Sequence, residues 1–207
     1  MILEFKDLVK KYNLKVSGVI HVGAHHAEEV PNYAEMGIEN IILFEPLKEN
    51  FDIIRKNVSS YPQLKIRKHQ VALGNSNQTI TMNLSSNQLE SSSILKPKLH
   101  LQLYPDIIFN KTEEVEVQKL DDYNCRKCNF LNMDVQGYEL EVLKGGKETL
   151  CNIDYVYCEV NRNEVYEGNA YIEQIDEFLS FYNMSRLETF WWDNGDWGDA
   201  FYKKEGT

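Results

Sequence analysis

The chain lacks any long hydrophobic run: none of its apolar stretches approaches the roughly 20 residues that a helix needs to cross a bilayer. Positive charge is also scarce, because 22 Lys and Arg residues face 32 Asp and Glu residues, which gives a net charge of −10. A chain of this sign has no obvious means of neutralising a phosphate backbone. We therefore expect no membrane span and no nucleic-acid partner.

Cysteine is the next scarcity, with only Cys125, Cys128, Cys151 and Cys158. The N-terminal segment is amphipathic and charged, unlike a signal peptide, so reduced thiols in a cytoplasmic protein are expected. The Cys125-x-x-Cys128 spacing is half of a zinc ligand set, but no second CxxC or HxxxH pattern follows it. This favours a loop with buried small side chains over a structural zinc.

The chain is well supplied with hydrophobic residues (43%) and aromatic residues (12%), which suits one buried core. We therefore expect residues 1–207 to form a single domain. Strand patterns cover residues 16–22, 40–46, 64–73, 79–84, 115–120, 129–135 and 154–160. Helical patterns cover residues 3–13, 27–36, 47–58, 138–145 and 170–182. Residues 185–204 read as two strands about the turn Asn194-Gly195. The alternation predicts an α/β fold whose sheet is mostly parallel and ends in an antiparallel hairpin.

Ligands of such sheets bind beyond the carboxyl ends of the strands. The first strand leads into "HVGAHHAEE", in which Gly23 permits a tight turn beside a ligand. The second ends at Glu45, which lies 22 residues after Gly23, near the offset of an acid that binds ribose hydroxyls. A solvated loop acid is the alternative for Glu45. The third ends in the small apolar residues 71–74, which suit an adenine ring.

Two further acids stand at matching positions in the second half. Asp134 follows an apolar run and precedes Gly137, and Glu159 ends the next strand. Two carboxylates at neighbouring strand ends can hold a divalent cation, share a general-base role or bind an ammonium group. The alternative is that either acid only caps a helix.

At this point the sequence resembles a known family. The segments "VIHVGAHHAEEVPNYAEMGIENIILFEP", "VALG", "SSSIL", "KLDDY" and "FLNMDVQGYELEVLKGG" are similar, in order and spacing, to the FkbM family of S-adenosylmethionine-dependent methyltransferases. The likeness runs from about residue 17 to residue 160. It implies a Rossmann-like class I methyltransferase fold: a seven-stranded, mostly parallel sheet with helices on both faces. It also implies methyl transfer to an oxygen, most often a hydroxyl of a sugar or a polyketide-like scaffold.

The resemblance also implies site residues. The cofactor-binding set carried over by position is His21, Gly23, Ala24, His25, Glu45, Pro46, Val71, Ala72, Leu73, Ser92, Ser93 and Asp134. The catalytic candidates are Asp134, Glu159, His25 and His100. The chain departs from the family at Ala27, where a second glycine is common, and at Asn132, where lysine is common.

A sugar hydroxyl needs a general base or a metal to become a nucleophile at neutral pH. A Mg²⁺ or Mn²⁺ ion on Asp134 and Glu159, with an added oxygen from Asn161, is one hypothesis. Adjacent histidines at a helix start are expected to point apart, so His25 is expected to face the cofactor. A histidine tucked against the strand end, without chemistry, is the alternative for it. His100 is expected to act as a substrate contact or base.

Two other functions stay open at this stage. A dinucleotide-dependent oxidoreductase shares the fold and the ribose acid, but it predicts a fuller glycine fingerprint and a hydride-transfer residue pair that the chain lacks. A non-catalytic Rossmann-like interaction domain is the other alternative, and the joint presence of Glu45 and Asp134 argues against it. The expected partner is a small-molecule or glycan acceptor, with a homodimer or a fusion to glycosyltransferase domains left open.

Overall fold

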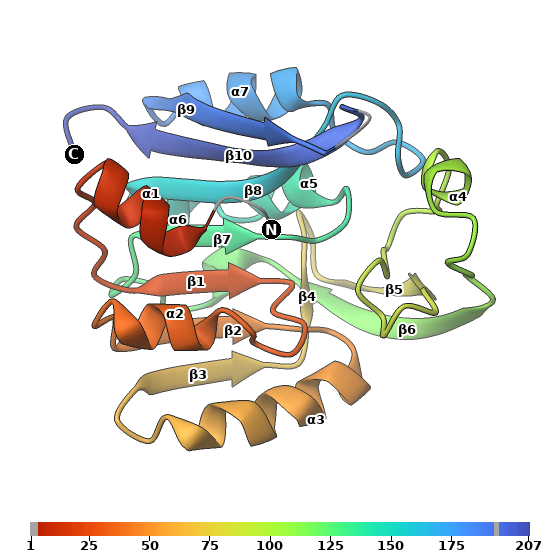
Figure 1. Cartoon of the computed structure of the whole chain (residues 1–207), viewed down its shortest axis with the longest axis horizontal. Coiled ribbons are helices and arrows are strands. Elements are labelled where there is room, and N and C mark those ends of the chain that lie inside the picture. The colour runs from red at the N-terminus through yellow and green to blue at the C-terminus, as the bar shows by residue number, and fades with distance from the viewer. Residues whose placement is uncertain (1–3, 193–194) are drawn as a thin grey trace.

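The computed structural model describes residues 4–192 and 195–207, and its centre is a seven-stranded sheet (Figure 1). The strand order is β3-β2-β1-β7-β8-β10-β9. The strands are β1 (Val19–Val22), β2 (Asn40–Phe44), β3 (Lys65–His69), β7 (Phe130–Met133), β8 (Tyr155–Asn161), β9 (Met184–Trp191) and β10 (Trp197–Lys204). The first five of these pair in parallel, whereas β10 runs antiparallel to both β8 and β9. The predicted sheet and C-terminal hairpin are confirmed.

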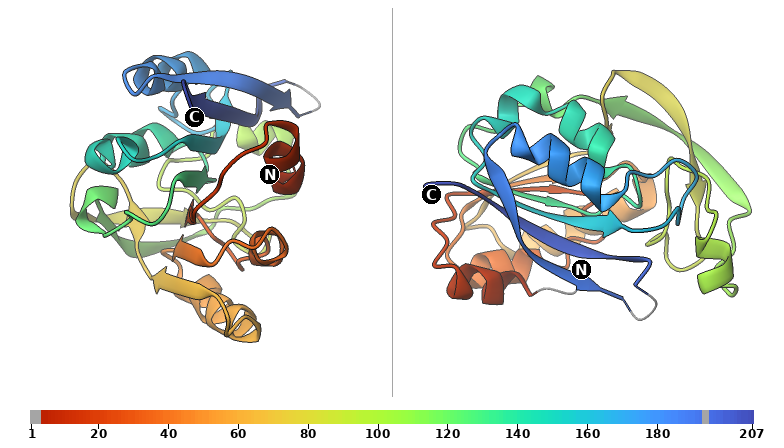
Figure 2. Two further views of the ribbon diagram at one scale, coloured as in Figure 1. Left: turned by 90° about the vertical axis from the view of Figure 1, so that its left-hand side faces the viewer. Right: turned by 90° about the horizontal axis from the view of Figure 1, so that it is seen from above.

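Helices cover both faces of this sheet, as the two side views show (Figure 2). One face packs against α1 (Phe5–Lys11), α2 (Val30–Glu35) and α3 (Lys48–Asn57), which is followed by the 3₁₀ turn η1 (Val58–Ser60). The other packs against α5 (Glu139–Lys144), α6 (Lys147–Leu150) and α7 (Ile172–Ser180). Successive strand residues face opposite sides, so Val19 joins the first core and Ile20 the second. All four residues of β1 are buried, as expected for a strand covered on both faces.

A second sheet, which the sequence pattern did not predict, has three strands in the order β4-β6-β5. Its strands are β4 (Ala72–Leu73), β5 (Gln78–Leu84) and β6 (Lys111–Gln118), and the 3₁₀ turn η2 (Leu120–Asp122) follows. The single strand expected over residues 64–73 is wrong, because the chain leaves the main sheet after β3 and pairs with β6 instead. The connection from β5 to β6 carries α4 (His100–Leu103) and lies beyond the carboxyl ends of β1 and β2 (Figure 1).

Two of the expected elements reach past the described residues. The expected first helix includes residue 3, and the expected hairpin turn includes Asn194; both residues lie outside the described part of the chain. Within residues 4–192 and 195–207, no helix is long and apolar enough to cross a membrane.

Candidate functional site

The first turn of the site follows β1 and depends on Gly23. Its φ is +75°, in the left-handed region, and an added Cβ would lie 1.9 Å from the Asp134 carbonyl oxygen. The N–H groups of Gly23 and Ala24 both donate to the Phe44 carbonyl at 3.0 Å. No larger residue fits this position without a shift of the backbone. The turn thereby brings the carboxyl ends of β1, β2 and β7 together.

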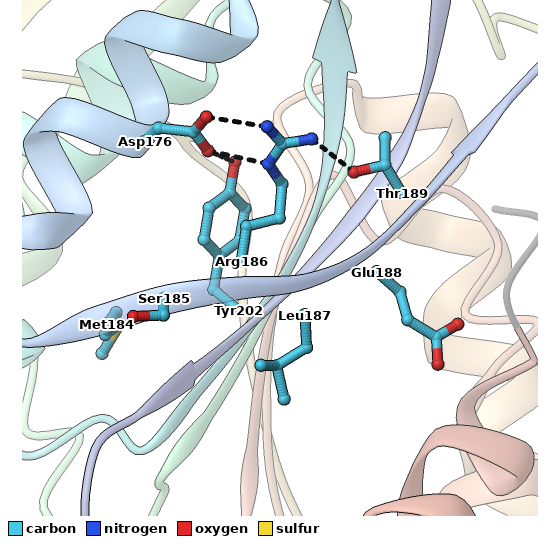
Figure 3. Close-up of a pocket in the computed structure, with 8 residues that line it drawn as sticks. All are labelled: Asp176, Met184, Ser185, Arg186, Leu187, Glu188, Thr189 and Tyr202. Carbon is cyan, nitrogen blue, oxygen red and sulfur yellow. Dashed lines mark hydrogen bonds and ion pairs between the residues drawn. The ribbon is translucent and has the colours of Figure 1, made fainter.

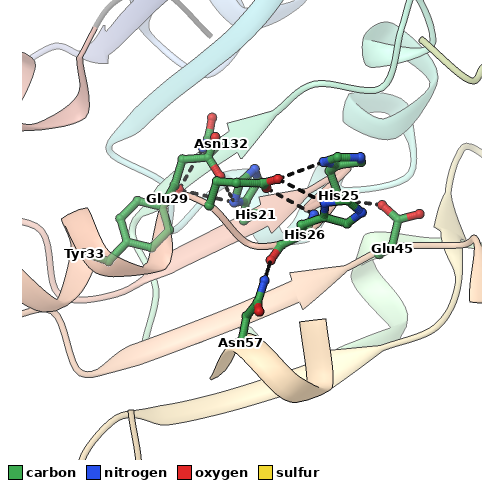
Figure 4. Close-up of polar contacts among 9 residues, drawn as sticks. His21, His25, His26, Glu29, Tyr33, Glu45, Asn57 and Asn132 are labelled. Carbon is green, nitrogen blue, oxygen red and sulfur yellow. Dashed lines mark hydrogen bonds and ion pairs between the residues drawn. The ribbon is translucent and has the colours of Figure 1, made fainter. Parts of the chain in front are cut away.

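Glu45 directly follows β2 and is 4% exposed. Its Oε2 accepts from the His25 backbone N–H at 3.0 Å, and its Oε1 accepts from the Leu47 N–H at 3.0 Å (Figure 4). The side-chain amide of Asn50 also donates to Oε1, at 3.4 Å. Burial raises the pKa of Glu45 to about 7, against the lowering effect of these hydrogen bonds. The carboxylate is therefore held in one orientation, unlike the solvated loop acid that was its alternative.

His25 and His26 do not point apart, and that expectation was wrong. Their rings stack with centroids 3.7 Å apart and planes 26° apart. The cause is the backbone, because His25 (φ +45°) and Ala27 (φ +61°) are both left-handed and the helix begins only at Val30. Ala27 thus adopts a conformation that glycine takes more readily, which accounts for the glycine common in the family at that position.

Both ring nitrogens of His25 are engaged. Nδ1 lies 3.0 Å from Glu28 Oε1, and Nε2 lies 2.9 Å from the Gln88 carbonyl oxygen. Burial lowers the pKa of His25, but its hydrogen bonds to Glu28 and Gln88 outweigh this and raise the pKa to about 9. A ring with both nitrogens occupied is poorly suited to take a proton from an acceptor.

Asn132, which stands where the family often has lysine, supports the first turn from the α2 side (Figure 4). Its Nδ2 donates to the Tyr33 hydroxyl at 2.8 Å, and that hydroxyl lies 3.3 Å from His21 Nδ1. All three side chains are buried, and burial lowers the pKa of His21. His21 is therefore neutral, and together with Tyr33 and Asn132 it supports the turn after β1.

Asp134 and Glu159 are joined by the amide of Gln136. Its Nε2 donates to Asp134 Oδ1 at 2.7 Å and to Glu159 Oε2 at 3.0 Å. The Tyr166 hydroxyl donates to the other end of the amide, Oε1, at 2.7 Å. Burial, together with the charges of Asp134, Glu139 and Asp199, raises the pKa of Glu159 well above its usual range.

This arrangement does not fit a divalent cation on Asp134 and Glu159. An N–H donor faces both carboxylates where a cation would have to lie, and the raised pKa of Glu159 favours the neutral acid, a poor ligand for hard cations. Asn161 lines none of the cavities described below, and both polar atoms of its buried side chain lack a partner. The structure does not support the Mg²⁺ or Mn²⁺ hypothesis.

Two adjoining cavities occupy the carboxyl edge of the sheet. The smaller, about 60 Å³, is lined by Gly23, His25, Glu45, Pro46, Val71, Ala72, Leu73, Ser92, Asp134 and other residues. The larger, about 570 Å³, is lined by His21, Gly23, Ala24, His25, His100, Asp134, Glu159 and other residues. Asp134 and Gln136 line both. The structure therefore gathers every expected cofactor-binding and catalytic residue except Ser93, whose buried hydroxyl instead donates to the Gln136 carbonyl at 2.7 Å.

His100 opens α4 and is 3% exposed. Burial lowers its pKa, and its Nδ1 has no hydrogen-bond partner. Its ring contacts those of Tyr104, Phe109 and Tyr166. A neutral imidazole with a free nitrogen in the wall of the larger cavity can contact an acceptor or take its proton.

Among the residues that the structure describes, the Cys125 and Cys128 thiols belong to no group of three potential metal ligands. Both are free and buried, and burial raises their pKa values to about 12 and about 11. Within residues 4–192 and 195–207, only one set of three His, Cys, Asp or Glu residues could hold a metal ion, and it contains no cysteine. The loop interpretation of the CxxC spacing is thus favoured.

A third cavity, about 350 Å³, lies beside β9 and away from the strand ends (Figure 3). Its charges are paired, because Arg186 pairs with Asp176 through two hydrogen bonds of 3.0 Å and Glu188 accepts from Lys11 and from the Tyr12 hydroxyl. The Tyr202 hydroxyl donates to the Asp176 carboxylate at 2.9 Å. No unpaired group of this cluster faces the cavity, so it is not a candidate site.

Gln136 and Tyr166 are the site residues that sequence reasoning missed. Gln136 stands inside the motif "MDVQGYE", but its φ of +54° decides where its side chain points. Tyr166 lies in the irregular segment after β8 and carries no local signal. Only the fold brings it 2.7 Å from Gln136.

Comparisons with known proteins agree with this geometry. Residues 21–186 match the family model described as Methyltransferase FkbM domain. The chain is 27% identical over 177 residues to the 2-O-methyltransferase NoeI of Sinorhizobium fredii, and the match covers 80% of this chain and 72% of NoeI.

Solved structures show the same fold. Methyltransferase FkbM from Methylobacillus flagellatus superposes with a TM-score of 0.60 and 14% identity over 90% of this chain. The match covers only 43% of that longer protein. Sp1610 of Streptococcus pneumoniae, in complex with S-adenosyl-L-methionine, superposes with a TM-score of 0.56 and 14% identity, over 99% of this chain and 73% of that one.

Proposed function

The chain belongs to the FkbM methyltransferase family, and we propose that it transfers the methyl group of S-adenosyl-L-methionine to a hydroxyl oxygen of a sugar or glycan. That it is an S-adenosylmethionine-dependent methyltransferase follows from the family. The name of the relative NoeI supports oxygen as the acceptor atom. The observation that carries the proposal is that Asp134 lines both adjoining cavities, so one carboxylate borders a cofactor pocket and an acceptor pocket.

The residues that line the smaller cavity suit the nucleoside part of the cofactor. The Glu45 carboxylate, fixed by backbone N–H donors, can accept from both ribose hydroxyls. The small apolar residues Val71, Ala72 and Leu73 supply a surface for the adenine. Gly23 allows the backbone to approach the methionine part closely, because no side chain intervenes.

The larger cavity fits a sugar ring. The aromatic side chains of Tyr104, Trp192 and Trp197 line it, and the two indoles lie with centroids 5.3 Å apart. The Trp197 Nε1–H donates to the Tyr104 hydroxyl at 3.1 Å, which fixes the Trp197 indole relative to the Tyr104 ring. Aromatic faces of this kind pack on the apolar faces of sugars while hydroxyl groups bond to neighbouring polar residues.

Bound S-adenosyl-L-methionine supplies an electrophilic methyl group on its sulfonium. In our proposal Asp134 orients the acceptor hydroxyl and takes its proton as the oxygen is methylated. Gln136 holds the Asp134 carboxylate in place during this step. The neutral imidazole of His100 also lines the larger cavity, where it contacts the acceptor in our proposal and is the second candidate base.

The test has two stages. Thermal-shift titrations should show that S-adenosylhomocysteine stabilises the protein and NAD does not. Transfer of labelled methyl groups should then be measured on a panel of mono- and oligosaccharides, with Asp134→Asn as the inactive control. No response to S-adenosylhomocysteine would refute the cofactor assignment. Methylation of a nitrogen or a carbon would refute the hydroxyl acceptor.

A further inference from the structure

We propose that His25, His26 and Glu28 form a binding site for one borderline divalent transition-metal ion, of the Zn²⁺ class. Their ligand atoms all lie within 4.8 Å of one another. Two imidazoles and one carboxylate are a donor set that Zn²⁺, Ni²⁺ and Cu²⁺ prefer, unlike Mg²⁺ or Ca²⁺. This site is separate from the Asp134–Glu159 pair and independent of the acceptor's identity.

The distances around Glu28 match a tetrahedral metal. Its Oε1 lies 3.0 Å from His25 Nδ1 and 3.4 Å from His26 Nδ1. Ligands bonded at about 2.1 Å in tetrahedral geometry lie about 3.4 Å apart. The stacked imidazoles place both Nδ1 atoms within 3.4 Å of the same oxygen, and a rotation of one ring about its Cβ–Cγ bond brings both in-plane lone pairs onto one ion.

The contacts outside these three ligand atoms fix which atoms are free to bind. The Gln88 carbonyl can only accept, so His25 Nε2 carries the hydrogen of that 2.9 Å bond. In the neutral ring the lone pair then lies on Nδ1, facing Glu28. A backbone carbonyl on the remote nitrogen is the usual partner of a metal-bound histidine.

Hydrogen bonds also hold the Glu28 carboxylate and the backbone of His26 in place. Glu28 Oε2 accepts from the His26 backbone N–H at 3.1 Å, which leaves Oε1 to face the two rings. The Asn57 amide donates to the His26 carbonyl at 2.8 Å and ties this turn to the end of α3 (Figure 4). The left-handed backbone at His25 and Ala27 is therefore held by contacts on both sides.

The proposed site keeps one open position. His25 and Glu28 line the 570 Å³ cavity, so an ion held by them would lie at the wall of that cavity with room for a fourth ligand. Three protein ligands with an open fourth position can take a water molecule or an oxygen of a bound small molecule. Without a metal, a proton on His25 satisfies the same Glu28 oxygen, and metal binding displaces it.

The site is tested on untagged, chelator-stripped protein, because a histidine tag would bind the same ions. Zn²⁺ uptake is measured by competition with a chromophoric chelator and by elemental analysis after dialysis. We expect one equivalent per chain, at least a tenfold loss of affinity in His26→Ala and in Glu28→Gln, and no Mg²⁺ uptake. Glu29→Gln is the matched control, since that carboxylate faces His21 at 3.8 Å, and it should keep wild-type affinity.

Two outcomes would overturn the proposal. One is no Zn²⁺ uptake by folded wild-type protein at pH 8. The other is uptake that His26→Ala leaves unchanged but that a Cys125→Ser, Cys128→Ser double variant abolishes, which would place the ion on the thiols. Circular dichroism of each variant checks that the fold is intact. A crystal soaked with Zn²⁺ and measured at its absorption edge would locate the ion directly.

Discussion

The Tyr166 hydroxyl donates to the side-chain oxygen of Gln136 across 2.7 Å, in a part of the molecule where both groups are largely shielded from water. An amide oxygen can only accept, so this contact turns the amide nitrogen toward Asp134 and Glu159. The same hydroxyl also lies 3.0 Å from the Ser91 carbonyl, which holds the phenol in place. Tyr166 therefore orients the Gln136 amide, and the amide in turn orients the carboxyl groups of Asp134 and Glu159.

Gln136→Glu should abolish most activity with little change in shape. The variant replaces the bridging N–H₂ with an oxygen and places a third carboxyl group beside Asp134 and Glu159. We expect kcat to fall about 100-fold, the equivalent of losing about 3 kcal/mol of charged hydrogen bonding. Steady-state kinetics with a sugar that the wild-type protein methylates checks this. In Tyr166→Phe, kcat should fall about tenfold. Wild-type kcat in Gln136→Glu would contradict the positioning role.

Glu45→Gln should weaken cofactor binding. The amide offers the ribose only one acceptor oxygen and no charge, so we expect affinity for S-adenosylhomocysteine to fall about 10- to 100-fold. Isothermal titration calorimetry measures it. Glu49→Gln, an exposed acid in the first turn of α3, is the control and should bind normally. Equal losses in the two variants would show that general charge, and not Glu45, governs binding.

Glu45 and Glu139 should each make the unliganded protein less stable as the pH rises from about 5 to about 8. Burial raises the folded-state pKa values of Glu45 and Glu139 to about 7, above the ordinary value of 4.5. Such groups bind protons more tightly when folded, so their contribution is full below pH 4.5 and is lost as the pH passes 7. Each contributes at most about 3 kcal/mol. Urea unfolding of Glu139→Gln across this range should show a flatter profile, and an unchanged slope would count against the assignment.

Gly23→Ala should be far more damaging than Gly37→Ala. Both glycines have left-handed φ angles, +75° and +74°. A Cβ at Gly37 meets nothing within 4 Å, whereas one at Gly23 would collide with the Asp134 carbonyl. We expect Gly37→Ala to cost about 1–2 kcal/mol of unfolding free energy. Gly23→Ala should cost more and also eliminate binding of S-adenosylhomocysteine; similar unfolding curves for the two variants would argue against a tight turn.

The gathering of Gly23, Glu45 and Asp134 at one edge of the sheet could be predicted from the sequence. Gly23, Glu45 and Asp134 each follow a buried apolar run, and parallel strands bring their carboxyl ends to one edge. The direction of the His25 ring could not be predicted, because it depends on two left-handed residues that carry side chains. Such backbone is rare outside glycine and leaves no compositional signal.

The three-stranded second sheet could not be predicted from the local sequence pattern, for a different reason. The two residues of β4 follow β3 after only Gln70 and Val71, and nothing in the pattern of residues 64–73 marks the point where pairing changes partner. Their new partner, β6, lies some forty residues further along the chain. Pairing at such a separation is decided by the whole fold, so the local pattern predicts a single strand over residues 64–73.

The antiparallel pairing of β5 with β6 gives residues 85–110 the character of an exchangeable cassette. Leu84 and Lys111 face each other in the ladder, so the segment leaves and re-enters the fold at a single point. It contributes Asn87, Glu90, Ser91, His100, Tyr104 and Ile107 to the larger cavity. Insertions, deletions or transplants here could evolve new acceptor preferences without disturbing the seven-stranded sheet. The same segment also places Leu89, Glu90, Ser92 and Ile94 in the wall of the smaller cavity, so such exchanges have to preserve those four positions.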